Sequence, residues 1–140
     1  MKLILNKVEE DENVTINYIK LNDEINGIIS YINNSNIVGY LGSEAYNIEL
    51  KNIYYFEGID NKNFIYTKDK CYECKYKLYE LEELKLNTFI RISKSIILNI
   101  KKISKVKGDL SGRLEATLIN NEKIIISRKY KSLLKERLGL

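Results

Sequence analysis

Apolar and polar residues alternate over short stretches along most of the chain after residue 36. This period of two is typical of β-strands that bury one face. It predicts strands at Ile37 to Leu41, Tyr46 to Leu50, Ile53 to Glu57, Asn63 to Thr67, Cys71 to Leu78, Phe89 to Ser93, Ile96 to Ile100, Ile103 to Lys107, Arg113 to Ile119 and Lys123 to Ile126. Turns are expected at Thr67 to Lys70 and at Asn120-Asn121, because Asn tolerates a positive φ. The fold class predicted is mainly β with short helices (α+β).

Two later segments place apolar residues at helical spacing instead. A brief helix is expected over Tyr79 to Lys85, and an amphipathic helix over Arg128 to Leu138 with Ser127 as its cap. The inward positions expected in these helices are Leu78, Leu81 and Leu84, and Tyr130, Leu133, Leu134 and Leu138. A helix-turn-helix reader needs two helices joined by a short turn, so this order argues against that class.

Residues 1–36 are predicted to form a strand-strand-helix extension ahead of a domain over residues 37–140. The strands are expected at Lys2 to Val8 and Val14 to Ile19. Asn22 or Asp23 is placed to cap the helix that follows, and Asn33-Asn34 to end it. Its apolar stripe consists of Leu21, Ile25, Ile28, Ile29 and Ile32. Such a stripe must cover another surface, either of the same chain or of a second copy.

Charge is distributed unevenly along the chain. The net charge is +4, yet residues 1–87 hold 10 Lys against 15 acidic residues, and residues 88–140 hold 13 Lys or Arg against 4. A basic segment of this strength favours a polyanion partner, nucleic acid more often than a membrane surface. The alternative is a basic face that is merely solvated.

The residue types present exclude several kinds of chemistry. The chain has no His, which removes histidine triads and His-ligated zinc. Cys71 and Cys74 form a C-x-x-C pair, but alternation along a strand turns them to opposite faces. We therefore expect no metal, no cofactor, no small-molecule substrate and no enzymatic activity. Neither a signal peptide nor a membrane span is indicated, so a cytoplasmic location is expected.

Two clusters carry the candidate nucleic-acid contacts. Arg128 and Lys129 occupy the first turn of the last helix, where free amides attract anions and an Arg can fork onto guanine. The second cluster is a turn whose hydroxyls and cations suit phosphates or base edges, with two further lysines beyond the next strand. Its members are Arg91, Ser93, Lys94 and Ser95, followed by Lys101 and Lys102.

Four blocks in order carry a family resemblance. They are the strand "IYYFE" from Ile53, the helix "LYELEEL" from Leu78, "FIRISKSIILNIKKI" from Phe89 and "ISRKYKSLLKERL" from Ile126. In order and spacing, residues from about Ile37 to the C-terminus resemble a LytTR-type DNA-binding domain, found in bacterial response regulators and in short stand-alone regulators. The resemblance implies an elongated arrangement of small β-sheets that inserts loop side chains into successive major grooves of double-stranded DNA.

The same resemblance implies roles for single residues and partners. By position, the reading residues are Asn63 in the loop after Glu57, Lys94 in the Arg-x-x-x-Ser turn, and Arg128; many members have His where this chain has Ser93. Thirty-six residues cannot hold a receiver domain, so control by phosphorylation is not expected. Stand-alone members imply a small membrane protein as a regulatory partner, and tandem sites favour a homodimer. A protein-protein interaction module without nucleic-acid binding is the alternative.

Overall fold

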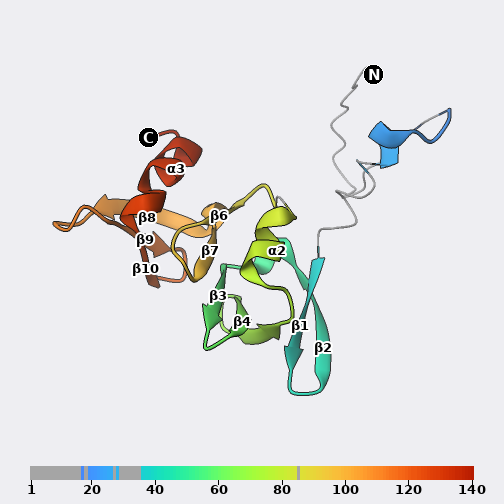
Figure 1. Cartoon of the computed structure of the whole chain (residues 1–140), viewed down its shortest axis with the longest axis horizontal. Coiled ribbons are helices and arrows are strands. Elements are labelled where there is room, and N and C mark those ends of the chain that lie inside the picture. The colour runs from blue at the N-terminus through green and yellow to red at the C-terminus, as the bar shows by residue number, and fades with distance from the viewer. Residues whose placement is uncertain (1–16, 18, 27, 29–35, 85) are drawn as a thin grey trace. The chain divides into compact units, whose positions relative to one another are not determined.

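The computed structural model describes residues 17, 19–26, 28, 36–84 and 86–140. The chain divides into two compact units, Met1–Asn33 and Asn34–Leu140 (Figure 1). In the first unit, residues 23–26 and 28 are helical, and Asn22 Oδ1 accepts a hydrogen bond from Ile25 N at 2.9 Å. Asn22 is therefore the helix cap, as predicted.

Most of the predicted extension lies outside the described residues, including the strand at Lys2 to Val8 and the helix end at Asn33-Asn34. Of the strand predicted over Val14 to Ile19, Asn17 and Ile19 are described, and neither is in a strand. The domain boundary at residue 36 stays a prediction.

Ten strands in two antiparallel sheets make up the described part of the second unit, with two α-helices and two short 3-10 turns. The first sheet has the order β2-β1-β5-β4-β3-β7-β6, and the second has the order β10-β9-β8. The bounds are β1 Asn36–Leu41, β2 Glu44–Glu49, β3 Tyr55–Ile59, β4 Lys62–Tyr66, β5 Cys71–Cys74, α2 Leu78–Glu83, β6 Phe89–Arg91, β7 Ile96–Asn99, β8 Ile103–Gly108, β9 Leu114–Leu118, β10 Lys123–Ile126 and α3 Arg128–Leu138, with 3-10 turns at Leu50–Asn52 and Ile100–Lys102. The mainly β expectation is confirmed.

The central strands of the first sheet bury both faces, and each face belongs to a different core. Because side chains alternate along a strand, Tyr55 and Leu98 enter one core, while their neighbours Phe56 and Ile97 enter the other. The second core lies toward α2 and β1, and its helix anchor is Leu81, which is 2% exposed.

The first core joins the two sheets and the last helix. It combines residues of β3, β6 and β7 with inward residues of the three-stranded sheet and with Leu134 of α3, which is fully buried. At its edge the rings of Tyr55 and Tyr66 stack with centroids 4.4 Å apart. Burial, followed by a hydrogen bond with Glu122, raises the pKa of the Tyr55 hydroxyl. This core fixes α3 against the turn that joins β6 to β7.

Three local expectations are wrong. Strand β5 ends at Cys74 rather than at Leu78, so the Lys75–Lys77 segment leads into α2 without pairing. Leu84 and Leu133 are each 43% exposed, because Leu81 and Leu134 supply the deep contacts of their helices. Ser127 precedes α3, but its side chain makes no cap hydrogen bond.

Among the residues that the structure describes, no helix combines the length and the apolar character needed to cross a bilayer.

Replacing Leu134 with Ala should lower the free energy of unfolding by about 2–5 kcal/mol, because the substitution leaves a cavity where α3 meets both sheets. Leu133→Ala on the same helix is the matched control and should cost less than half as much, since that side chain is already 43% exposed. Chemical denaturation monitored by circular dichroism measures both. Equal losses would contradict the placement of α3.

Candidate nucleic-acid interface

The turn Ile92–Ser95, between β6 and β7, is held at both ends by other elements. The Ile92 carbonyl accepts hydrogen bonds from Ser127 N at 3.0 Å and from Ser127 Oγ at 3.2 Å. The Ser95 carbonyl accepts from Gly58 N of β3 at 2.8 Å. The Ser127 hydroxyl thus ties the turn to α3 instead of capping the helix. The 92–95 turn is fixed to α3 on one side and to the β3–β4 hairpin on the other.

Arg91 closes the 92–95 turn from within. Its Nε donates to the Ser93 carbonyl at 2.7 Å, and its Nη2 donates to the Lys94 carbonyl. Its Nη1 pairs with Glu82 of α2. Ser93 Oγ also accepts a hydrogen bond from Ser95 N at 3.2 Å. All four carbonyl groups of the turn are therefore occupied, and the Lys94 side chain is exposed.

The start of α3 lies beside this turn because Ser127 bonds Ile92. Arg128 and Lys129 occupy the first helical turn, and both are exposed. The Arg128 side chain passes Gly112 of the β8–β9 loop, its Nε lying 3.9 Å from the position that a Cβ at Gly112 would take. The structure thus brings the turn that carries Ser93, Lys94 and Ser95 next to the start of α3, which carries Arg128 and Lys129.

The β8–β9 loop beside Arg128 is organised by one carboxylate. Asp109 Oδ1 accepts hydrogen bonds from Ser111 N, Ser111 Oγ and Arg113 N at 2.7 to 3.0 Å. Asp109 Oδ2 accepts from Arg113 Nε at 3.0 Å. The hydrogen bond from Ser111, followed by those from Arg113, lowers the pKa of the Asp109 carboxyl. Sequence reasoning missed this loop, although Asp-x-Ser-Gly is a recognisable turn signal.

The β3–β4 hairpin lies at the same end of the sheet, but Asn63 is not in its loop. Asn63 is the second residue of β4, is 8% exposed and pairs with Gly58 and Cys74. The loop prediction fails because Asp60 and Asn61, at φ of 49° and 62°, make a tighter turn that starts β4 at Lys62. Asp60, Asn61 and Lys62 are the exposed polar residues there.

Lys101 and Lys102 lie at the other end of β7. The strand pairs Glu57 with Ile96 and Tyr55 with Leu98, so the hairpin tip and Lys94 share one end. The whole of β7, Ile96–Asn99, lies between Lys94 and Lys101. Lys102 lies with the Thr67–Lys70 turn around an open hollow of about 480 Å³. The predicted contacts therefore occupy two separate places.

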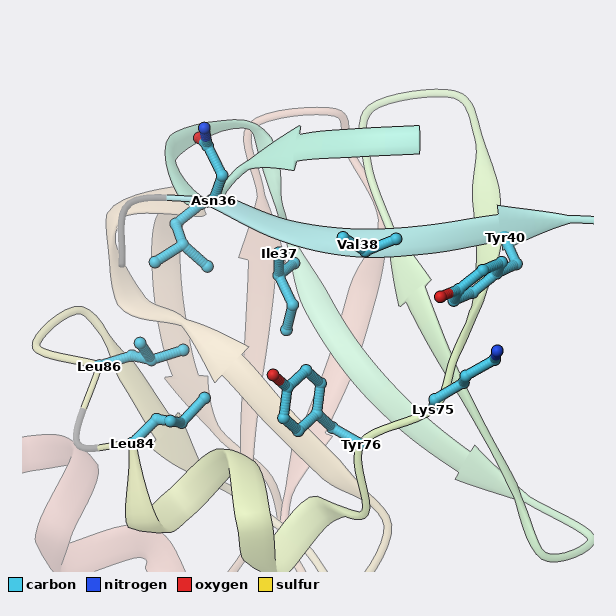
Figure 2. Close-up of a pocket in the computed structure, with 9 residues that line it drawn as sticks. Asn36, Ile37, Val38, Tyr40, Lys75, Tyr76, Leu84 and Leu86 are labelled. Atoms are coloured by element: carbon cyan, nitrogen blue, oxygen red, sulfur yellow. The ribbon is translucent and has the colours of Figure 1, made fainter. Parts of the chain in front are cut away.

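Another hollow, between β1 and the segment that leads into α2, has a different character. Figure 2 shows Ile37, Val38, Leu84 and Leu86 around it. Its volume is about 380 Å³, and among the described residues that line it Lys75 is the one with a charge, its Nζ lying 4.3 Å from the centre of the Tyr40 ring. The described lining is therefore mainly apolar.

The cysteines lie as the strand alternation predicts. Cys71 is exposed and Cys74 is 4% exposed, on opposite faces of β5. Within the described ranges, no group of three or more acidic, Cys or His side chains is placed to hold a metal ion.

Comparison with known proteins shows which family has this arrangement of strands. Residues 43–139 match the family model described as the LytTr DNA-binding domain. The chain belongs to the LytTR family. A solved LytTr DNA-binding domain from Bacillus cereus matches this LytTR chain with a TM-score of 0.71 and 24% identity, covering 76% of this chain and 98% of that one.

Two relatives match the LytTR chain along its whole length. An uncharacterized HTH-type transcriptional regulator of Staphylococcus aureus (strain bovine RF122 / ET3-1) is 31% identical over 144 residues, covering 100% of this chain and 98% of the relative. Another, from strain MRSA252, is 30% identical with the same coverage. Both relatives are named as HTH-type regulators. In this LytTR domain, five strands separate α2 from α3, the two α-helices described between residues 36 and 140.

Proposed function

We propose that this LytTR protein is a bacterial transcriptional regulator that binds double-stranded DNA sequence-specifically, with side chains of the 92–95 turn and of the first turn of α3 in the major groove. The observation that carries the proposal is the double hydrogen bond from Ser127 to the Ile92 carbonyl. These bonds hold the turn that carries Lys94 against the start of α3, which carries Arg128. Within the described chain, no acidic side chain forms an ion pair with either cation.

The chemistry of these side chains suits some of them to base contacts and others to phosphate contacts. Arg128 projects from a helix start, where a guanidinium can donate two parallel hydrogen bonds to guanine O6 and N7. Lys94 offers a point charge with three donors, which suits a base edge or a phosphate. Lys129, together with the hydroxyls of Ser93 and Ser95, can bond the phosphates on either side.

Asn63 and the distant lysines take supporting parts in this proposal. An ideal Cβ at Gly58 would lie 2.9 Å from Asn63 Oδ1, so Asn63 fills the space beside Gly58. It thereby shapes the hairpin whose exposed tip is formed by Asp60, Asn61 and Lys62. Lys101 and Lys102, at the far end of β7, are proposed to contact phosphates only.

The protein should bind duplex DNA with an affinity that falls steeply with salt, because cations that replace counterions at phosphates release them. Six phosphate contacts would lower the affinity about 1,000-fold between about 50 and 200 mM salt. Fluorescence anisotropy with fragments selected from random duplexes measures this. Flat binding across that range, or binding to no fragment, would favour a protein-protein interaction module instead.

Arg128→Ala and Lys94→Ala should each lose discrimination among sequences, at about 1–3 kcal/mol for a good base contact. Lys101→Ala and Lys102→Ala are the matched controls and should weaken binding to all sequences alike. Competition of selected against scrambled duplexes separates the two effects. The assignment is reversed if the controls change sequence preference while Arg128→Ala keeps it.

The remaining parts of the proposal concern class, location and partners. We propose a protein without enzymatic activity that works in the cytoplasm, in agreement with its DNA-binding family. A small membrane protein as regulatory partner rests on the resemblance to stand-alone regulators alone. Co-purification of the full chain with membranes tests that partner, and its absence from every membrane fraction would remove it.

The full chain should form a homodimer at micromolar concentration. In the first unit Leu21, which precedes the helix cap, is 49% exposed, and Ile28 of the helix is 37% exposed, so part of the predicted apolar stripe is open to a partner. Two linked domains would also fill a tandem site together. Light scattering and paired-site titration measure this, and a monomer at high micromolar concentration that fills two half-sites independently would contradict it.

A further inference from the structure

We propose that Arg91 is a positioning residue: it fixes the 92–95 turn so that Lys94 faces the DNA, and Glu82 of α2 in turn fixes Arg91. This inference rests on the proposed function of that turn. It assigns Arg91 a place behind the interface rather than a contact with DNA, and it brings α2 into the recognition of sequence.

The geometry around Arg91 uses its whole guanidinium group. Nε bonds the Ser93 carbonyl, Nη2 bonds the Lys94 carbonyl and Nη1 pairs with Glu82, so each nitrogen has a partner within the protein. The Arg91 side chain is 18% exposed, whereas that of Glu82 is 47% exposed. A contact with DNA through these three N–H groups would take Arg91 away from its partners, and the turn would lose two of its carbonyl bonds.

The shape of the guanidinium explains why this position holds Arg. Its nitrogens lie in a rigid plane, and two of them meet the carbonyl groups of consecutive residues. The Ser93 and Lys94 carbonyl groups flank the Cα of Lys94. Holding both of them therefore sets the direction in which the Lys94 side chain projects. A lysine carries the same charge, but it is a point donor that cannot fix two carbonyl groups in one plane.

Glu82 has a fixed place from which to orient Arg91. It follows Leu81, which is 2% exposed and packs in the core on the α2 side of the first sheet. Glu80 Oε2 accepts a hydrogen bond from Lys77 N at 2.9 Å and so steadies the start of α2. The pairing also compensates the charge of Arg91, so this residue adds little to the attraction of phosphates.

The test uses the full chain and a duplex that the wild-type protein selects from random sequences. The measured quantity is the ratio of its affinity to that for a scrambled duplex, with thermal melting as a check on folding. Arg91→Lys should lower the ratio about 10-fold while the net charge is kept. Glu82→Ala should also lower it, whereas Glu83→Ala, which removes the same charge from an exposed neighbour, should leave it unchanged.

A double variant separates positioning from mere structural support. If Arg91 acts through Lys94, Arg91→Lys combined with Lys94→Ala should discriminate no worse than Lys94→Ala alone, because both changes remove one interaction. Independent, multiplying losses would overturn the proposal. An Arg91→Lys variant with the wild-type affinity ratio would also overturn the proposal. That result is expected if residue 91 contacts a phosphate, because a lysine can replace an arginine there.

The failure of this inference is distinguishable from failure of the proposed function. If Lys94→Ala loses discrimination while Arg91→Lys and Glu82→Ala keep it, the role of Arg91 is wrong and the interface stands. If no duplex is selected, or Lys94→Ala keeps the wild-type ratio, the proposed function of the turn falls and this inference with it. Should Arg91→Lys melt early, the Glu82→Ala and Glu83→Ala pair decides alone.

Discussion

The carbonyl group of Ile92 is the point on which the arrangement of basic side chains depends. Ile92 is fully buried, and a buried carbonyl without a partner costs about 1–3 kcal/mol. Ser127 supplies that partner twice, through its amide and its hydroxyl. Ile92 directly follows β6 of one sheet, and Ser127 directly follows β10 of the other, so these bonds join the two sheets beside Lys94 and Arg128. The polar requirement of a single buried group thus holds the turn that carries Lys94 against the start of α3.

The two cores give that bond a rigid setting. Strands β3 and β7 place alternate residues in different cores, so a shift of either strand by one residue would send each apolar set into the core that the other set fills. Leu134 holds α3 in the first core, and Leu81 holds α2 in the second. The 92–95 turn therefore receives partners from both sides of the sheet. Short strands and short helices are enough to hold this turn in place, because each of them packs against a core to which several other elements also contribute.

The sequence predicts the elements well because their periodicity is local. The residue range of α3 and that of β10 are predicted correctly, since each has a strong apolar pattern and a clear break beside it. Tertiary hydrogen bonds are not local. Serine is a favoured helix-cap residue, yet the Ser127 hydroxyl donates its hydrogen bond to the carbonyl of Ile92, 35 residues away. Arg91 is of a residue type that often contacts DNA. Only the three-dimensional structure shows that its acceptors lie within the turn and on α2.

The position of Asn63 illustrates the same limit at a single turn. The segment after Glu57 has Gly58, then Asp60 and Asn61, and the pattern alone does not say which pair of residues turns the chain. Asp60 and Asn61 both take positive φ, which makes the hairpin tight and starts β4 one residue before Asn63. A shift of this size moves a side chain from an exposed loop into a buried strand.

Net charge is likewise an incomplete guide to where DNA would be attracted. Within the described part of residues 88–140, four of the cations are paired with carboxylates: Arg91 with Glu82, Arg113 with Asp109, and both Lys107 and Lys123 with Glu115. Exposed pairs of this kind cancel much of each other's field in water. The attraction of DNA then depends more on the cations without such partners than on the net charge of the segment. At the end of the sheet where the two strands meet through Ile92 and Ser127, those are Lys94, Arg128 and Lys129, and their position rather than their number makes this end suited to a groove lined by phosphates.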